Sequence, residues 1–263
     1  MMDNTSPTVL PAEHRKISAT LTRARRHARA LPGFPGDVPQ SLAEAYAIQS
    51  QSLAGWADDV AGWKVGGVPP DYRDRFDDEW LAGPIFRSNT RFAHGDDPAD
   101  MPVFAGGFAA IEAEFVLRTG ATEAEDRLYI GTEIASSPVP DINGYGPCAV
   151  ISDFGNNRGL LVGDEVADWR DLENIEVTTL IDGQEVGRAV VERVSEGVGI
   201  SARFLRANLA SRGIALPEGS FISCGALTGV HEADIGAQGD ISFAGLGRLR
   251  MTLVEAEIAA ETN

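Results

Sequence analysis

The chain has 263 residues, and 22 lysines and arginines against 39 aspartates and glutamates give it a formal net charge of -17. This charge repels nucleic-acid phosphates and anionic lipid surfaces, so we expect neither nucleic acid nor a membrane as a partner. The chain has two widely spaced cysteines, no apolar stretch of membrane-spanning length and no signal-peptide pattern at its start, which together favour a cytoplasmic protein.

Two helices are predicted in the first sixty residues. Residues 13–30 alternate apolar and basic positions at helical spacing, which we interpret as an amphipathic helix with a solvated basic face. The basic residues on that face are Arg15, Lys16, Arg23, Arg25, Arg26 and Arg29. Ser41 and Glu44 then have capping-box spacing ahead of a second helix. We predict an N-terminal helical lobe over residues 1–60 and a β-rich catalytic body over residues 61–263.

The body is expected to be mainly sheet. Short β-type runs separated by glycine and proline follow residue 60, and one later helix is predicted around residues 200–213, ending at Gly213. The pair Asp182-Gly183 between alternating runs predicts a hairpin. Within residues 241–254, Leu249, Met251 and Leu253 alternate after a glycine-rich turn. The fold class is therefore predicted to be α+β, with a mixed β-sheet roll or sandwich.

An apolar run at residues 108–117, FAAIEAEFVL, contains two carboxylates. In a strand Glu112 and Glu114 share one face, roughly 6.5 Å apart. That face could be exposed to solvent, could share a proton, or could hold a cation. Glu133 lies in a second apolar run, YIGTEIASS, and three buried glutamates favour a hard cation. Oxygen ligands select Mg²⁺ or Mn²⁺ over zinc.

A positive side chain is also needed near three carboxylates and one dication if the site is to bind an anion. Lys64 is the candidate, because glycines lie on both sides of it in AGWKVGG and would permit close approach of a ligand. A lysine in a strand can equally extend its amine to the surface.

Six motifs in order carry a family resemblance over residues 41–254. They are AYAIQ, GWKVG, IEAEFVL, TEIASS, SDFGNNRGLLVG and ISCGALTGVHEADIGAQGDISFAGLG. This order resembles the fumarylacetoacetate hydrolase superfamily, and within it the branch of 2-keto-4-pentenoate hydratase and 4-oxalocrotonate decarboxylase.

The resemblance assigns roles to particular residues. It implies that Glu112, Glu114 and Glu133 bind Mg²⁺ or Mn²⁺ and that Lys64 is catalytic. It implies that Gly225 and Thr228 border the substrate pocket, and that Asn156 or Asn157 lies in an asparagine-rich loop, with Asn157 assigned to substrate. His231, after the same turn, is interpreted as a hydrogen-bonded structural histidine.

The implied activity is a metal-dependent lyase that hydrates a small 2-hydroxydienoate, or 2-oxo-alkenoate, to a 4-hydroxy-2-oxo acid, as in meta-cleavage of aromatic compounds. The alternatives are a 4-oxalocrotonate-type decarboxylase, an acylpyruvate-type C–C hydrolase, and a catalytically silent acid binder. A homo-oligomer is also implied. Two departures from the family pattern bear on the substrate: Pro138 follows Ser137 where relatives carry an arginine, and Leu81-Ala82 precede Gly83 where relatives carry an acid.

Overall fold

Four α-helices and thirteen strands occur in the residues that the computed structural model describes, 10–76 and 78–258. The helices are α1 (Ala12–Arg26), α2 (Leu42–Ala54), α3 (Pro147–Ser152) and α4 (Val194–Ser211). The strands are β1 (Val60–Gly67), β2 (Trp80–Phe86), β3 (Thr90–Phe92), β4 (Ala99–Val103), β5 (Phe108–Arg118), β6 (Arg127–Ser137), β7 (Asn157–Glu165), β8 (Glu173–Ile181), β9 (Gln184–Arg193), β10 (Phe221–Ser223), β11 (His231–Glu232), β12 (Gln238–Phe243) and β13 (Gly247–Glu255). Within this part of the chain, no helix is both long and apolar enough to cross a membrane.

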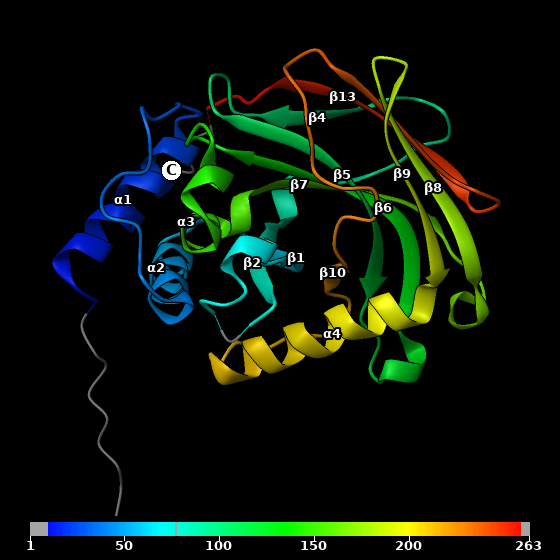
Figure 1. Cartoon of the computed structure of the whole chain (residues 1–263), viewed down its shortest axis with the longest axis horizontal. Helices are drawn as coiled ribbons and strands as arrows, with labels where there is room; N and C mark the ends of the chain where they lie inside the picture. Colours follow the sequence, from blue (N-terminus) through cyan, green and yellow to red (C-terminus); the bar gives the residue numbers. More distant parts are fainter. Residues whose placement is uncertain (1–9, 77, 259–263) are drawn as a thin grey trace, which may run out of the picture.

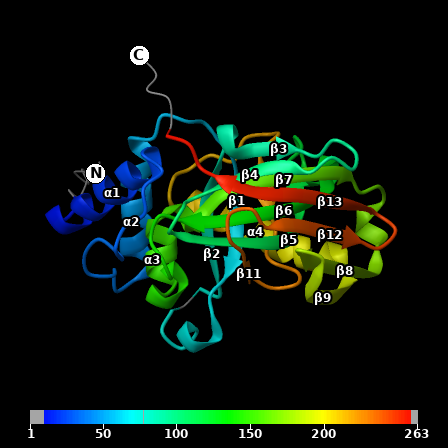
Figure 2. The same cartoon turned by 90° about the horizontal axis from the view of Figure 1, so that it is seen from above.

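The strands form two mixed sheets. The larger sheet has eight strands in the order β2-β1-β10-β5-β6-β7-β3, with β11 paired to β5, and the smaller has the order β4-β13-β12-β8-β9. Parallel pairs such as β1 with β10 and β13 with β4 occur among antiparallel ones. Figures 1 and 2 show α1, α2 and α3 gathered at one end of the sheets. This architecture confirms the predicted α+β class.

The main core lies between the two sheets, and strand β5 shows why. Its side chains alternate, so that Ile111, Phe115 and their neighbours on one face join the main apolar cluster. Phe115 packs against Phe243 of β12 in the smaller sheet, with ring centroids 5.4 Å apart. The opposite face of β5 is left to carry the two glutamates.

The predicted cap of the second helix is confirmed. The Ser41 hydroxyl accepts a hydrogen bond from the Glu44 backbone N–H at 3.2 Å. Helix α3 was not predicted, because six residues are too few to show a helical period. It packs against α2, so the helical layer includes a segment from beyond residue 60. The boundary at residue 60 stays a prediction.

The predicted hairpin and the predicted late helix are both present, but the helix begins earlier than predicted. Strands β8 and β9 pair around Asp182 and Gly183, whose φ angles of 51° and 76° are those of a two-residue hairpin turn. Helix α4 begins at Val194, six residues before the predicted start at residue 200. Glycines at 197 and 199 weaken the helical signal there, yet Val194 and Val198 are buried and anchor this first turn.

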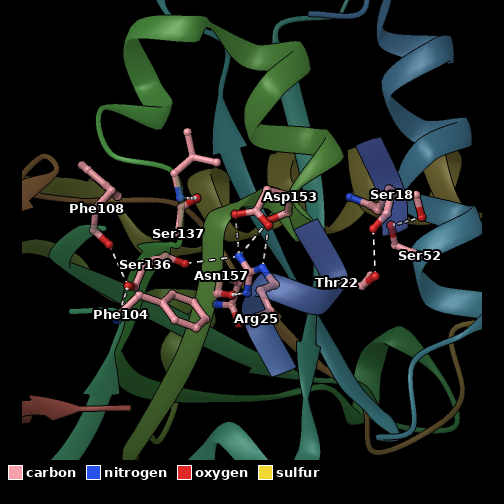
Figure 3. A network of polar contacts seen from close by, with 12 residues as sticks. Ser18, Thr22, Arg25, Ser52, Phe104, Phe108, Ser136, Ser137, Asp153 and Asn157 are labelled. Atoms are coloured by element: carbon pink, nitrogen blue, oxygen red, sulfur yellow. Dashed lines mark hydrogen bonds and ion pairs between the residues drawn. The ribbon is translucent and has the colours of Figure 1, made fainter. Parts of the chain in front are cut away.

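Arg25 is a correction to the predicted basic face of α1. It is buried, and its guanidinium donates to both carboxylate oxygens of Asp153 at 2.6 and 2.9 Å (Figure 3). It also donates to the carbonyl of Asn157 at 2.8 Å and to that of Ser136 at 3.2 Å. Arg25 therefore fastens α1 to the ends of β6 and β7, and its charge is satisfied inside the protein.

Candidate metal centre and adjoining cavity

The three glutamates meet on one face of the larger sheet. Glu112 lies directly opposite Glu133 in the register of β5 and β6, and Glu114 lies two residues further along the same face. One carboxylate oxygen from each lies within 4.8 Å of the other two. Their exposed fractions are 5% for Glu112 and 0% for Glu114 and Glu133. This convergence is the one that the sequence predicts.

Neighbouring donors fix two of the carboxylates. The Ser223 hydroxyl and the Gly225 backbone N–H, the latter at 3.0 Å, both donate to Glu114 Oε2. The Asn157 amide donates to Glu133 Oε1 at 2.9 Å. These bonds hold Oε2 of Glu114 and Oε1 of Glu133 and leave the other oxygen of each carboxylate available to a ligand, as outer hydrogen bonds do around metal ligands.

Lys64 completes the cluster from β1. Its Nζ lies 3.2 Å from Glu133 Oε2, and both side chains are buried. Burial by itself would lower the pKa of Lys64, but the carboxylates of Glu133, Glu112 and Glu114 outweigh it and raise that pKa overall. Lys64 therefore carries its charge at neutral pH. The predicted alternative, a lysine extending to the surface, does not apply.

Mutual repulsion and burial act on the glutamates as well. Burial first, and then the Glu133 carboxylate, raises the pKa of Glu112 to about 7, although Lys64 acts in the opposite direction. Burial first, and then the carboxylates of Glu133 and Glu112, raise the pKa of Glu114 well above its usual range. Without a cation the cluster therefore tends to hold a proton near neutral pH.

The residues fit a hard divalent cation. Glu114 Oε1 is buried and has no hydrogen-bond partner among the described residues, which is costly unless a ligand or proton compensates it. Three carboxylates and one ammonium sum to a charge of -2, which a dication neutralises. The donors are oxygen atoms alone, as Mg²⁺ and Mn²⁺ prefer.

A cavity of about 500 Å³ adjoins the cluster, and Lys64, Glu112 and Gly225 line it. Asn156 also lines it and has a buried Oδ1 without a hydrogen-bond partner among the described residues. A separate hollow of about 310 Å³ near Arg118 and Phe221 contains none of the predicted site residues. The cavity beside the glutamates is therefore the candidate substrate site.

Two of the predicted substrate contacts lie elsewhere. Thr228 does not line this cavity, and its hydroxyl lies 2.8 Å from that of Thr179 and 3.1 Å from His231 Nε2. Asn157 lies behind Glu133 and holds that carboxylate, so Asn156 is the asparagine that faces the cavity. His231 has the hydrogen-bonded environment that the sequence predicts.

The turn at residues 154–156 explains how two adjacent asparagines take different roles. Phe154, Gly155 and Asn156 all have positive φ, at 55°, 66° and 51°. Such angles are unfavourable for the two residues that have side chains and persist only where the surroundings enforce them. A Cβ at Gly155 would lie 2.7 Å from the Gly83 Cα, so only glycine fits there. Ser223, whose hydroxyl donates to Glu114, lies in the ISCGALTG motif, but no pattern in the sequence marks it as a partner of that glutamate.

Known proteins resemble this chain in structure, whereas the sequence comparisons found no match. No family model matches the chain, and no curated protein sequence matches it. A 4-oxalocrotonate decarboxylase from Pseudomonas putida G7, solved with magnesium and adipate, matches with a TM-score of 0.73 and 18% identity, covering 92% of this chain and 97% of that one. A fumarylpyruvate hydrolase from Pseudomonas aeruginosa, solved with Mn²⁺ and pyruvate, matches with a TM-score of 0.53 and 14% identity, covering 77% and 94%.

A third solved structure is a 5-carboxymethyl-2-hydroxymuconate delta-isomerase from Mycobacterium smegmatis, with a TM-score of 0.51, 17% identity, and 76% and 81% of the two chains covered. At these identities the likeness establishes the fold. The chain therefore shares the fold of these three enzymes, and the fold that the motif resemblance implies is confirmed at that level.

Proposed function

We propose that this chain, with its fumarylacetoacetate hydrolase fold, is a divalent-metal-dependent lyase that adds water to a small 2-hydroxydienoate to give a 4-hydroxy-2-oxo acid. The observation that carries the proposal is the buried cluster of Glu112, Glu114, Glu133 and Lys64 beside the cavity. Mg²⁺ or Mn²⁺ held by the three glutamates would supply Lewis-acid polarisation of a chelating carboxylate and 2-oxo group.

The residues of the chain have distinct parts in such a reaction. The glutamates hold the cation and do not transfer protons, because a coordinated carboxylate has little remaining proton affinity. The Lys64 ammonium, buried among them, stabilises negative charge that develops on the substrate oxygen. The unpartnered Asn156 Oδ1 can accept a hydrogen bond from water in the cavity.

Decarboxylation of a 2-oxo diacid is a second candidate function. It is favoured by the likeness to 4-oxalocrotonate decarboxylase, whose structure matches over 92% of this chain. The same charged cluster serves both reactions, because each develops an enolate that needs the same electrostatic stabilisation.

A product assay tests the proposal. With Mg²⁺ and 2-hydroxypenta-2,4-dienoate, the wild type should consume the dienol absorbance and form 4-hydroxy-2-oxopentanoate, identified by NMR. Lys64→Met should lower turnover at least about a hundredfold, because it removes the charge facing the developing anion. Lys16→Met, at an exposed position of α1, should leave turnover unchanged.

Three results would contradict the hydratase assignment. Release of CO₂ from 4-oxalocrotonate without hydration of the dienoate would point to the decarboxylase. Cleavage of acetylpyruvate would point to the C–C hydrolase, and metal binding without turnover of any of the three acids would point to a silent acid binder.

Metal affinity should depend on pH. The pKa of Glu112 is raised to about 7, chiefly by burial, and the cation binds only the deprotonated carboxylate. Below about pH 7 the apparent affinity for Mn²⁺ should therefore fall about tenfold for each pH unit and each proton displaced. Calorimetric titrations from about pH 5.5 to 8.5 measure this slope. An affinity that stays constant below pH 7 would contradict it.

A further inference from the structure

The charged side chains of the cavity are concentrated in the glutamate cluster. Among the described residues that line the cavity, Lys64 and Glu112 are the only ones with an acidic or basic side chain. Both belong to the glutamate cluster, where Lys64 pairs with Glu133. The bulkier apolar lining residues are Trp80, Leu81, Val150, Ile200, Leu227 and Val230. The remaining wall thus offers no cation to a second anionic group.

This apolar wall is assembled from four separate parts of the chain. Trp80 and Leu81 begin β2, Val150 belongs to α3, Ile200 belongs to α4, and the loop after β10 supplies Leu227 and Val230. Ile200 and Val230 are 36% and 49% exposed, so the apolar surface continues to the mouth of the cavity. Isolated exposed apolar residues are ordinary, but here they extend the lining of a site.

The polar groups of the wall are neutral and mostly occupied. The Ser201 hydroxyl donates to the Cys224 carbonyl at 2.7 Å, and Asn156 Nδ2 donates to Asn143 Oδ1 at 3.3 Å. Among the buried side-chain atoms of the described wall residues, the acceptor Asn156 Oδ1 is left without a hydrogen-bond partner. An acceptor repels a carboxylate and binds a hydroxyl or water, so this group also fails to serve a second acid.

We propose that the substrate is a monocarboxylate, a 2-oxo or 2-hydroxydienoate acid whose far end is uncharged and apolar, and that the cavity discriminates against dicarboxylates. This inference rests on the proposed function for the end of the acid that binds the metal. The three glutamates, Lys64 and a dication sum to zero charge, so one carboxylate leaves the site at -1. A second carboxylate would be desolvated against the apolar wall without a cationic partner.

Binding of a matched pair of saturated acids tests the inference without requiring turnover. 2-Oxohexanoate and 2-oxoadipate have six carbons each and differ in a terminal methyl against a terminal carboxylate. Calorimetry with the full-length wild type and saturating Mg²⁺ should give at least about tenfold tighter binding of 2-oxohexanoate. Lengthening the tail to 2-oxooctanoate should improve binding further, by up to about fourfold for each methylene that becomes buried.

A charge placed on the wall should reverse the preference. Ile200→Lys adds an ammonium at the mouth of the cavity, on an exposed side of α4, and should favour 2-oxoadipate over 2-oxohexanoate. Val190→Lys is the matched control, because Val190 is 55% exposed on β9, does not line the cavity, and receives the same charge. The control should keep the wild-type preference.

The outcomes separate this inference from the proposed function. Equal or tighter binding of 2-oxoadipate by the wild type overturns the inference, even where the dienoate is hydrated. A preference for 2-oxohexanoate that Ile200→Lys reverses supports it, even where no acid is turned over and the hydratase proposal fails. Binding of neither acid in the presence of Mg²⁺ overturns the inference as well.

Discussion

Replacing Glu114 with glutamine should abolish divalent-metal binding and activity together while leaving the metal-free protein at least as stable as the wild type. The amide oxygen can still accept from the Ser223 hydroxyl and the Gly225 N–H, which now hold Oε2. The amide NH₂ then takes the place of the unpartnered Oε1, where it points donors instead of a ligand at the cation. One negative charge also leaves a crowded cluster, which relieves repulsion.

The size of the effect can be followed by calorimetry and by thermal unfolding. Loss of a direct ligand should weaken Mn²⁺ binding more than about 100-fold, beyond the 10- to 100-fold typical of outer hydrogen-bond partners. Metal at 100 times its dissociation constant stabilises the wild type by about 2.7 kcal/mol, and Glu114→Gln should lose that gain.

A matched control separates the loss of a ligand from the loss of a surface charge. Glu173→Gln removes an exposed carboxylate at the start of β8 and should retain the metal-dependent stabilisation. Turnover by Glu114→Gln in metal-stripped protein would remove the proposed centre altogether, because activity would then not need the cation.

The sequence predicts part of this centre because part of it is local. Alternation along β5 is enough to place Glu112 and Glu114 on one face. The position of Glu133 depends on how β6 pairs with β5, and a shift of one residue would turn it to the opposite face. No local pattern encodes that register, so only the two apolar runs and the family resemblance pointed to the convergence.

The asparagines and Arg25 show two other limits. Asn156 and Asn157 are identical in type and adjacent, and only the left-handed backbone of Asn156 decides which one faces the cavity. For Arg25, the helical period itself was informative, since Ile17, Leu21, Ala24 and Arg25 lie on the buried face of α1. An arginine is usually solvated, which is why its position was predicted to be exposed. Its buried partner Asp153 lies 128 residues away in the chain, so no local pattern revealed the ion pair.

Substituting Arg25 with methionine should produce the largest loss of stability among single changes in α1. Methionine has a similar length but leaves the Asp153 carboxylate buried without its cation. Breaking such a buried pair typically costs about 3–5 kcal/mol of the free energy of unfolding. Denaturant titration should show this loss, whereas Arg23→Met, at an exposed position of the same helix, should change stability by less than about 0.5 kcal/mol.

The cause can be separated from general damage to the helix. Arg25→Met combined with Asp153→Leu removes both charges and should recover a large part of the loss, because the penalty comes from the unpaired carboxylate. Arg25 Nη1 also donates to the carbonyl of Asn157, whose side chain holds Glu133. Folded Arg25→Met should therefore bind Mn²⁺ about 10- to 100-fold more weakly. A loss of stability below about 1 kcal/mol, or unchanged metal affinity in the folded variant, would show that α1 and the metal centre are not linked through this residue.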